Sequence, residues 1–285
     1  LRPEDFDDSR YDPSFSPLVY PGQTVHGSVF LPKYMPDTWV SLYVKEGHTG
    51  IISEGEKIKP EKNVWTELIY PIPEMEGGMI EEIGFCFHIG GKHTQVFDFS
   101  GCIDDLYVTG TPAYSIEFAK ENEEIWTGIH REISQFTKLK GLTYLDGDKL
   151  HLSCGDFGAV YTGRHDWKDY QAEFTIVPVT GEYHYVNVRV QGAIRSYGIG
   201  LLPEGKAGIL KNNNGWEILE VTDFSWNPGE EYKIRVKIEE NEISAVFNDQ
   251  KRITYIDEEN PYLEGGIGLT VEKGSHVSCK TIVIS

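Results

Sequence analysis

Two segments of this chain alternate strictly between apolar and polar residues, at positions 185–191 and 232–239. Alternation with a period of two is typical of a β-strand that buries one face and exposes the other. Similar runs, separated by glycine, proline and asparagine, recur over nearly the whole sequence. We therefore expect an all-β fold of packed sheets, a class in which ligands are often recognised at the surface.

The expected strands fall into two groups, separated by Thr109-Gly110-Thr111-Pro112. With 285 residues the chain is long enough for two domains that each have a hydrophobic core. We place one β-sandwich domain at residues 1–112 and a second at residues 113–285. A short helical turn is expected only at residues 130–136.

The chain is strongly acidic, with a formal net charge of −19 at pH 7. Such a surface repels nucleic acid and anionic membranes, so we expect neither as a partner. No apolar run approaches the roughly 18 residues that a membrane-spanning helix needs. The charge is compatible with neutral ligands such as sugars and with cations such as calcium, and it is equally compatible with a role in solubility alone. Because the sequence begins Leu1-Arg2-Pro3, we interpret it as part of a longer protein, which leaves the compartment open.

Four segments follow one another in the first half: Pro21-Gly22-Gln23-Thr24-Val25, Val40-Ser41-Leu42-Tyr43-Val44-Lys45, Trp65-Thr66-Glu67-Leu68 and Cys102-Ile103-Asp104-Asp105-Leu106. Their order resembles the jelly-roll carbohydrate-binding modules of families four, nine and twenty-two. The resemblance implies a galactose-binding-like jelly roll. In those modules an aspartate of the matching strand often binds a structural calcium, with further ligands from the N-terminal segment. The resemblance therefore implies a calcium site at Asp104 and Asp105, for which Asp5, Asp7, Asp8 and Asp12 are available as further ligands. The alternative is that these two carboxylates are solvated or cap a turn.

Three segments characterise the second half: Asp166-Trp167-Lys168-Asp169-Tyr170, Tyr197-Gly198-Ile199-Gly200-Leu201 and Gly265-Gly266-Ile267-Gly268-Leu269. With them the second half is similar to the concanavalin and laminin-G type of sandwich, as found in the 3-keto-disaccharide hydrolase-like family. The resemblance covers about residues 114–285. The predicted order is therefore a jelly roll followed by a concanavalin- or laminin-G-like sandwich.

The alternation at residues 185–191 also suggests a ligand-binding face. It puts Val186, Val188 and Val190 on one side of the strand and three polar or aromatic residues on the other. A tyrosine ring can stack on a sugar, and amide and guanidinium groups can donate to its hydroxyls. Alternatively, the arginine is buried against a carboxylate and joins the two sheets. The predicted ligand face consists of Tyr185, Asn187, Arg189, Tyr197 and Trp216.

The sequence contains no motif that indicates an active site. Its nine histidines show no metal-ligand spacing, and there is no nucleophile elbow or phosphate-binding loop. The four cysteines, Cys86, Cys102, Cys154 and Cys279, form no CxxC pair, so we expect buried free thiols, although a Cys86–Cys102 bridge is possible. Trp39, Trp65, Trp126 and Trp226 could each serve as binding platforms, but a single tryptophan in a sandwich is more often in the core.

Taken together, these patterns predict a carbohydrate-binding, non-catalytic region of a larger hydrolase. The parent would be a glycoside hydrolase or, by a looser resemblance, an ADP-ribosylglycohydrolase-like enzyme, and its catalytic domain would be a partner of this region. One alternative is an enzyme in its own right, of the 3-keto-disaccharide hydrolase-like kind. Another is a structural module that only docks against its parent.

Overall fold

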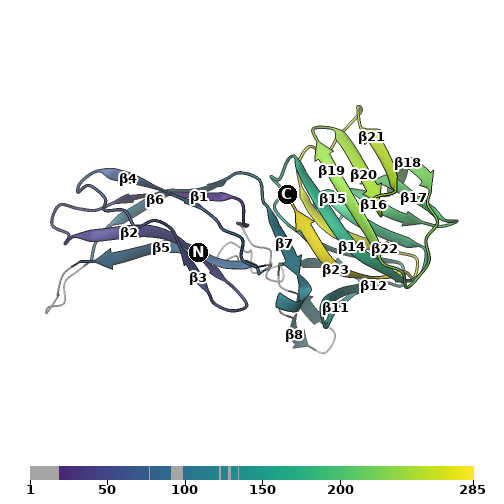
Figure 1. The fold of residues 1–285 in the computed structure, drawn as a ribbon, viewed down its shortest axis with the longest axis horizontal. Coiled ribbons are helices and arrows are strands. Elements are labelled where there is room, and N and C mark those ends of the chain that lie inside the picture. Colours follow the sequence, from purple (N-terminus) through teal and green to yellow (C-terminus); the bar gives the residue numbers. More distant parts are fainter. Residues whose placement is uncertain (1–18, 77, 91–98, 122, 128–129, 134) are drawn as a thin grey trace.

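The computed structural model describes residues 19–76, 78–90, 99–121, 123–127, 130–133 and 135–285. Nearly all of the regular structure in this part of the chain is β-strand, and the only helical element described is a single 3₁₀ turn, η2 (Phe118–Lys120). Figure 1 shows a smaller sandwich built from the first strands and a larger one built from the rest. The predicted all-β fold built of β-sandwiches is confirmed, whereas the assignment of the first as a jelly roll and the second as concanavalin- or laminin-G-like stays a prediction.

The smaller sandwich consists of two three-stranded antiparallel sheets. One has the strand order β4-β1-β6 and the other the order β3-β2-β5. The inward side chains are apolar and buried, among them Val25, Val29, Val40, Leu42 and Leu68. The strands are β1 (Thr24–Phe30), β2 (Thr38–Glu46), β3 (Ile52–Glu54), β4 (Trp65–Pro71), β5 (Ile80–Ile89) and β6 (Cys102–Thr109).

The larger sandwich packs a seven-stranded sheet against an eight-stranded one. The first has the order β10-β13-β22-β15-β16-β17-β18, and the second has the order β11-β12-β23-β14-β19-β20-β21, with β7 paired to β23. The early strands are β7 (Tyr114–Glu117), β8 (Glu123–Thr127), β9 (His130–Ile133), β10 (Thr137–Lys140), β11 (Leu142–Asp146), β12 (Lys149–Ser153) and β13 (Phe157–Thr162). The central strands are β14 (Tyr170–Thr180), β15 (Tyr183–Gly192), β16 (Arg195–Leu202), β17 (Lys206–Asn213) and β18 (Trp216–Asp223). The last are β19 (Tyr232–Glu239), β20 (Glu242–Phe247), β21 (Lys251–Ile256), β22 (Gly266–Glu272) and β23 (His276–Ile284).

The expected helical turn at residues 130–136 is wrong. Residues 130–133 form β9, which pairs with β8 in a separate two-stranded ribbon. This segment is too short for its periodicity to distinguish one helical turn from a short strand. Pairing with a neighbouring segment then determines which of the two forms.

The boundary at residue 112 stays a prediction, and one buried residue crosses it. Tyr20 precedes the first strand of the smaller sandwich, yet its ring belongs to the core of the larger one. The ring centroid lies 5.0 Å from that of Tyr114 and 4.8 Å from that of Trp167. Beside it, the Ala113 amide donates to the Pro21 carbonyl at 2.8 Å.

All four cysteines are free thiols, as expected. The possible Cys86–Cys102 bridge is not formed, since Cys86 lies in β5 of one sheet and Cys102 in β6 of the other. The expectation that all four are buried is wrong, because only Cys279 is fully buried and Cys102 is exposed.

Gly200 lies where neighbouring strands of the seven-stranded sheet pack closely, so a substitution there tests this packing. A Cβ atom at this position would overlap the His184 carbonyl and lie 2.8 Å from the Tyr185 Cα atom. We expect Gly200→Ala to lower the free energy of unfolding by about 2–3 kcal/mol, because backbone atoms cannot give way as a flexible side chain can. Urea unfolding measures this change. Gly155→Ala is the control, because nothing lies within 4 Å of its added Cβ; an equal loss in both variants would contradict the packing explanation.

Candidate functional site

The structure does not bring the five predicted ligand residues together on one exposed face. Tyr185, Asn187, Arg189 and Tyr197 are each no more than 2% exposed, so the predicted exposure of this face is wrong. Only Trp216 is partly accessible. The physical reason is that β15 lies in the middle of the seven-stranded sheet and is covered on both faces.

Three of the five residues, Tyr185, Asn187 and Trp216, share the outer face of this sheet. The ring centroids of Tyr185 and Trp216 are 5.1 Å apart, and the Trp216 ring occupies the space that a side chain at position 198 would need. The Asn187 side chain accepts a hydrogen bond from Thr270 Oγ1 at 2.7 Å and donates one to the Tyr197 carbonyl at 3.4 Å. Because its hydrogen bonds are made within the protein, Asn187 holds neighbouring strands together in this structure.

Arg189 breaks the predicted alternation. Its φ of 51° and the register shifts around it mark a β-bulge. As a result Val190 lies in a small cluster with Ala159 and Tyr161, away from the main core that contains Val186 and Val188. The bulge turns the Arg189 guanidinium toward the opposite sheet, where its Nη2 atom lies 3.0 Å from Asp169 Oδ1. This contact agrees with the alternative interpretation, in which Arg189 is a buried cation that joins the two sheets.

Tyr197 belongs to a buried polar network. Its hydroxyl donates to Asp257 Oδ2 at 2.6 Å, and Lys211 Nζ donates to the same oxygen at 2.5 Å. Burial raises the pKa of Asp257, but hydrogen bonds from Lys211, Tyr197 and the Asn260 amide outweigh it and hold that pKa below its ordinary value. The network ties β16 and β17 to the segment between β21 and β22.

The two predicted calcium ligands lie together at a bulge in β6. Asp104 and Asp105 are both exposed, and the Asp105 amide donates to Asp104 Oδ1 at 2.9 Å. Asp105 has a φ of 50°. The acidic residues Asp5, Asp7, Asp8 and Asp12, which were to complete the site, lie outside the described residues. The described residues supply no third carboxylate here, so the calcium site stays a prediction.

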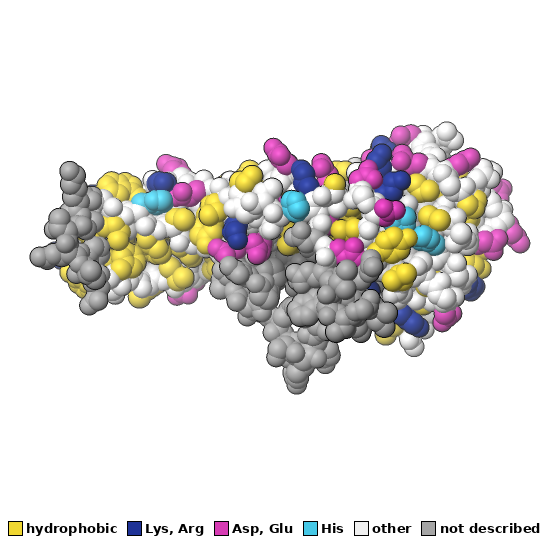
Figure 2. All heavy atoms as spheres, turned by 90° about the horizontal axis from the view of Figure 1, so that it is seen from below, with side chains coloured by type: hydrophobic (Ala, Val, Ile, Leu, Met, Phe, Trp, Pro, Cys, Tyr) yellow, Lys and Arg dark blue, Asp and Glu magenta, His cyan; other side chains and the backbone are white. Residues whose placement is uncertain are grey.

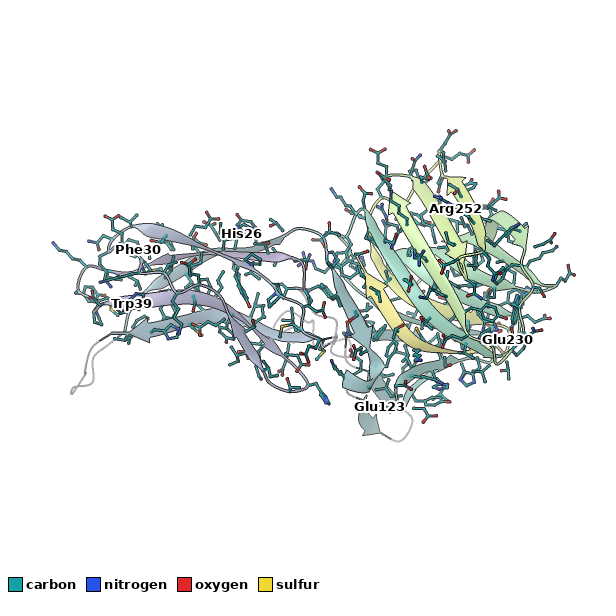
Figure 3. All side chains as sticks on the ribbon, in the orientation of Figure 1. His26, Phe30, Trp39, Glu123, Glu230 and Arg252 are labelled. Carbon is teal, nitrogen blue, oxygen red and sulfur yellow. The ribbon has the colours of Figure 1, made fainter. Side chains whose placement is uncertain are left out.

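A surface that we did not predict as a unit covers the outer face of the β4-β1-β6 sheet. We call it the β1 face and define it by Phe30, Trp65, Tyr107, His26 and Glu67. Trp65 and Tyr107 are each 49% exposed, a high value for aromatic side chains. The strands bring them together because Phe30 pairs with Trp65 and His26 pairs with Tyr107. Figure 3 labels His26 and Phe30 on β1, in the upper layer of the smaller sandwich.

The aromatic rings of the β1 face form two platforms. The Phe30 and Trp65 centroids lie 5.6 Å apart, and the His26 ring stacks on Tyr107 at 4.5 Å. His26 and Phe30 are four positions apart in β1, so the two platforms are separated by about 13 Å along an extended strand. Between them lie carboxylates, including that of Glu67, which is 3.3 Å from His26 Nδ1. The arrangement offers apolar ring faces with hydrogen-bonding groups between them.

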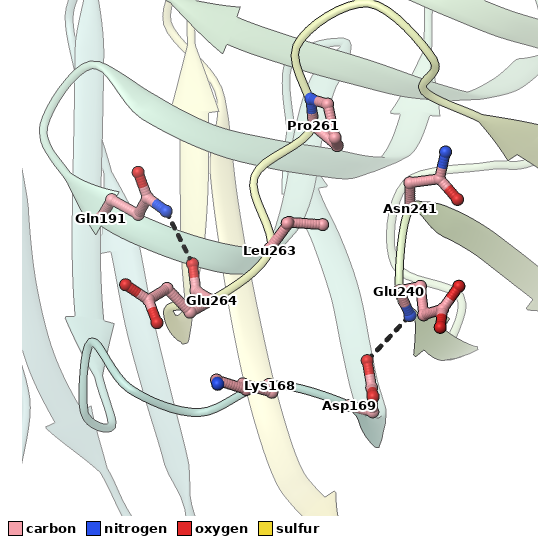
Figure 4. A pocket seen from close by; sticks show the side chains of 8 residues that line it. All are labelled: Lys168, Asp169, Gln191, Glu240, Asn241, Pro261, Leu263 and Glu264. Atoms are coloured by element: carbon pink, nitrogen blue, oxygen red, sulfur yellow. Dashed lines mark hydrogen bonds between the residues drawn. The ribbon is translucent and has the colours of Figure 1, made fainter.

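The larger sandwich has an open cavity of about 850 Å³ at one end (Figure 4). Its walls are rich in carboxylates and amides and contain no aromatic ring. Some of the lining residues form hydrogen bonds with one another. Gln191 Nε2 donates to the Glu264 carbonyl at 2.9 Å, and the Glu240 amide donates to Asp169 Oδ1 at 2.8 Å. It is lined by Lys168, Asp169, Gln191, Glu240, Asn241, Pro261, Leu263 and Glu264.

Acid–base chemistry would need two carboxyl groups with shifted pKa values near one another. Burial raises the pKa of Glu272, which accepts a hydrogen bond from the Tyr185 hydroxyl at 3.2 Å. One carboxyl group of the described residues therefore has a raised pKa, and a single group does not by itself form such a pair.

The aromatic platforms on the β1 face could have been found from the sequence by one signal. The alternation of β1 places His26, Ser28 and Phe30 on the face opposite Val25 and Val29. Trp65 was identified as a possible platform, but its partner was not. Trp39 and Trp65 are indeed exposed, whereas Trp226 is half-buried and donates to the Leu202 carbonyl at 2.8 Å. The side chain of Trp126 lies outside the described residues.

Several solved β-sandwich structures are similar to about half of the chain. The carbohydrate-binding module CBM66 from Bacillus subtilis is 15% identical, with a TM-score of 0.47 over 52% of this chain and 94% of the module. The exoplasmic/lumenal domain of VIP36, in a Ca²⁺- and Man3GlcNAc-bound form, is 12% identical, with a TM-score of 0.41 over 53% of this chain and 84% of that domain. A protein with a galectin-like fold from Bacillus subtilis is 10% identical, with a TM-score of 0.43 over 52% of this chain and 87% of that one.

No family model and no curated protein matches the sequence. Identities this low describe a fold alone, so the ligand has to be inferred from the chain's own surface. No helix in the described part of the chain is long and apolar enough to cross a membrane.

Proposed function

We propose that this chain is a carbohydrate-binding, non-catalytic region of a larger hydrolase and that it binds glycan on the β1 face. The parent is a glycoside hydrolase or an ADP-ribosylglycohydrolase-like enzyme. The observation that carries the proposal is the exposure of Trp65 and Tyr107 on one sheet, each beside a second ring. Such rings stack on the apolar faces of sugars, and the polar groups between them bind hydroxyls.

The spacing and charge of the β1 face limit the kind of glycan. Two platforms about 13 Å apart along β1 suit an extended oligosaccharide better than a single sugar. Glu67 and Asp104 add negative charge to a chain of net charge −19. Because like charges repel, we expect neutral glycans to bind and sulfated or uronic-acid glycans to bind poorly.

A glycan array followed by calorimetry tests this proposal. We expect Trp65→Ala and Tyr107→Ala each to weaken binding about 10- to 100-fold, since each removes a central aromatic contact of the surface. Trp216→Ala is the matched control, because it removes a partly exposed tryptophan from the larger sandwich. Circular dichroism of each variant checks that the fold is intact.

Each outcome has a distinct meaning. If Trp216→Ala weakens binding and Trp65→Ala does not, glycan binds on the outer face of the seven-stranded sheet and the β1 face is wrong. If no glycan binds, the carbohydrate proposal fails and docking against a parent domain or catalysis in this chain takes its place.

Structural calcium at Asp104 and Asp105 is part of the same proposal. Two adjacent carboxylates suit a hard cation, and they lie on the strand that carries Tyr107. Repeating the array with calcium and with EDTA tests this point. Unchanged binding and an unchanged melting temperature in EDTA would remove calcium from the proposal.

A further inference from the structure

Three metal-binding side chains meet on the outer face of the β3-β2-β5 sheet, in the opposite layer from the β1 face. Glu54 is the last residue of β3, and Cys86 and His88 occupy alternate positions of β5. Alternate residues of a strand point to the same face. One ligand atom from each of the three side chains lies within 4.8 Å of the other two. Among the described residues, this is the only group of three such side chains.

The contacts around the group hold it in place. His88 Nε2 is hydrogen-bonded to Glu54 Oε1, and Ser41 Oγ donates to the same oxygen at 2.5 Å. Ser41 lies in β2, between the strands that carry the three side chains, and pairs in register with Cys86. The histidine and the cysteine are both half-buried. Figure 2 looks at the molecule from below, toward this layer of the smaller sandwich, where histidine, acidic and basic side chains meet in one patch among hydrophobic ones.

We propose that Glu54, Cys86 and His88 bind a Zn²⁺ ion, with a fourth position left to water. Thiolate and imidazole ligands favour zinc over calcium or magnesium, which prefer oxygen ligands alone. Three protein ligands and one water form a common zinc arrangement. Ser41 acts as the outer partner that orients the Glu54 carboxylate. Binding requires the thiolate of Cys86, so its proton is released to solvent and the affinity rises with pH.

The charges nearby act in both directions. Lys57 Nζ lies 3.5 Å from Glu54 Oε1 and opposes a cation, while the net charge of −19 attracts one. The site is independent of the proposed glycan surface, because it uses other strands and other residues.

A Co²⁺ titration of the reduced 285-residue chain tests the proposal, with Zn²⁺ then displacing the cobalt. We expect one equivalent of Co²⁺ to give a thiolate-to-cobalt absorption band that Zn²⁺ removes. Cys86→Ser should abolish the band, and His88→Gln should weaken Zn²⁺ binding by more than the 10- to 100-fold expected for an outer partner. Ser41→Ala should weaken it by about 10- to 100-fold.

The matched control is Cys102→Ser, which removes an exposed free thiol from the other sheet of the same sandwich. It should leave the band and the affinity unchanged. The proposal is overturned if the wild-type protein gives no thiolate band, or if Cys86→Ser and Cys102→Ser behave alike. Should Cys86→Ser fail to fold, an unchanged Zn²⁺ affinity in His88→Gln would also overturn it. Glycan binding by Trp65→Ala is measured separately, so failure of one proposal leaves the other standing.

Discussion

Replacing Asp257 with alanine is expected to lower the free energy of unfolding by about 3–5 kcal/mol. Asp257 and Lys211 form an ion pair in which the side chains are only 5% and 8% exposed. Without the carboxylate, the lysine remains a buried charge, and the Tyr197 hydroxyl loses the acceptor that it has at 2.6 Å. Urea unfolding followed by tryptophan fluorescence measures the loss.

A double variant separates the ion pair from the packing around it. Adding Lys211→Met to Asp257→Ala removes the unpaired charge and should restore part of the lost stability. Lys206→Met is the control, because Lys206 makes only a surface ion pair with Glu204 at 3.6 Å. A loss below about 1 kcal/mol in Asp257→Ala would show that water reaches Lys211 and that the pair is not truly buried.

Acidification between about pH 6.5 and pH 4 is expected to cost about 3 kcal/mol of stability through His184 alone. Burial lowers the pKa of this histidine to about 4. Below pH 6.5 the unfolded chain therefore takes up a proton that the folded chain still excludes, and stability falls as the pH falls. The loss is complete once the pH has passed the folded-state pKa.

His184→Gln isolates this effect from the titration of carboxylates. Glutamine can donate to the Gly181 carbonyl, as His184 Nε2 is placed to do at 3.2 Å, but it does not titrate in this range. The difference in unfolding free energy between pH 7 and pH 4 should shrink by about 3 kcal/mol in this variant. The control is His165→Gln, at an exposed position. An identical pH dependence in wild type and His184→Gln would contradict the assigned pKa.

Period-two patterns predicted the architecture but not the faces of buried strands. In β19 the alternation matches the structure, because one face of that strand is buried and the other meets solvent. In β15 both faces are covered, so alternation carries no information about exposure. The bulge at Arg189 then reverses the face of the residues that follow, and no local signal in Val188-Arg189-Val190 marks it.

The residues of each candidate site come together only through strand pairing, and the pairing of distant strands cannot be read directly from the sequence. Phe30 and Trp65 are 35 positions apart and become neighbours because β1 and β4 pair in one register. Cys86 and His88 are visible as an alternating pair, but Glu54 joins them only through β2. A list of single tryptophans, cysteines and histidines therefore contained the members of both sites without showing which of them meet.

The connection between the two sandwiches consists of two chain segments, not one. Residues 19–23 and 110–114 run beside each other, joined by the hydrogen bonds from Ala113 to Pro21 and from Gln23 to Gly110. A single linker allows two domains to rotate relative to each other, whereas two hydrogen-bonded segments resist such rotation. In addition, the Tyr20 ring would have to leave the core of the larger sandwich before the two sandwiches could rotate. A glycan bound to the smaller sandwich would therefore be held in a fixed position relative to the larger one. The larger sandwich would then fix the distance and the angle between the bound glycan and any attached enzyme.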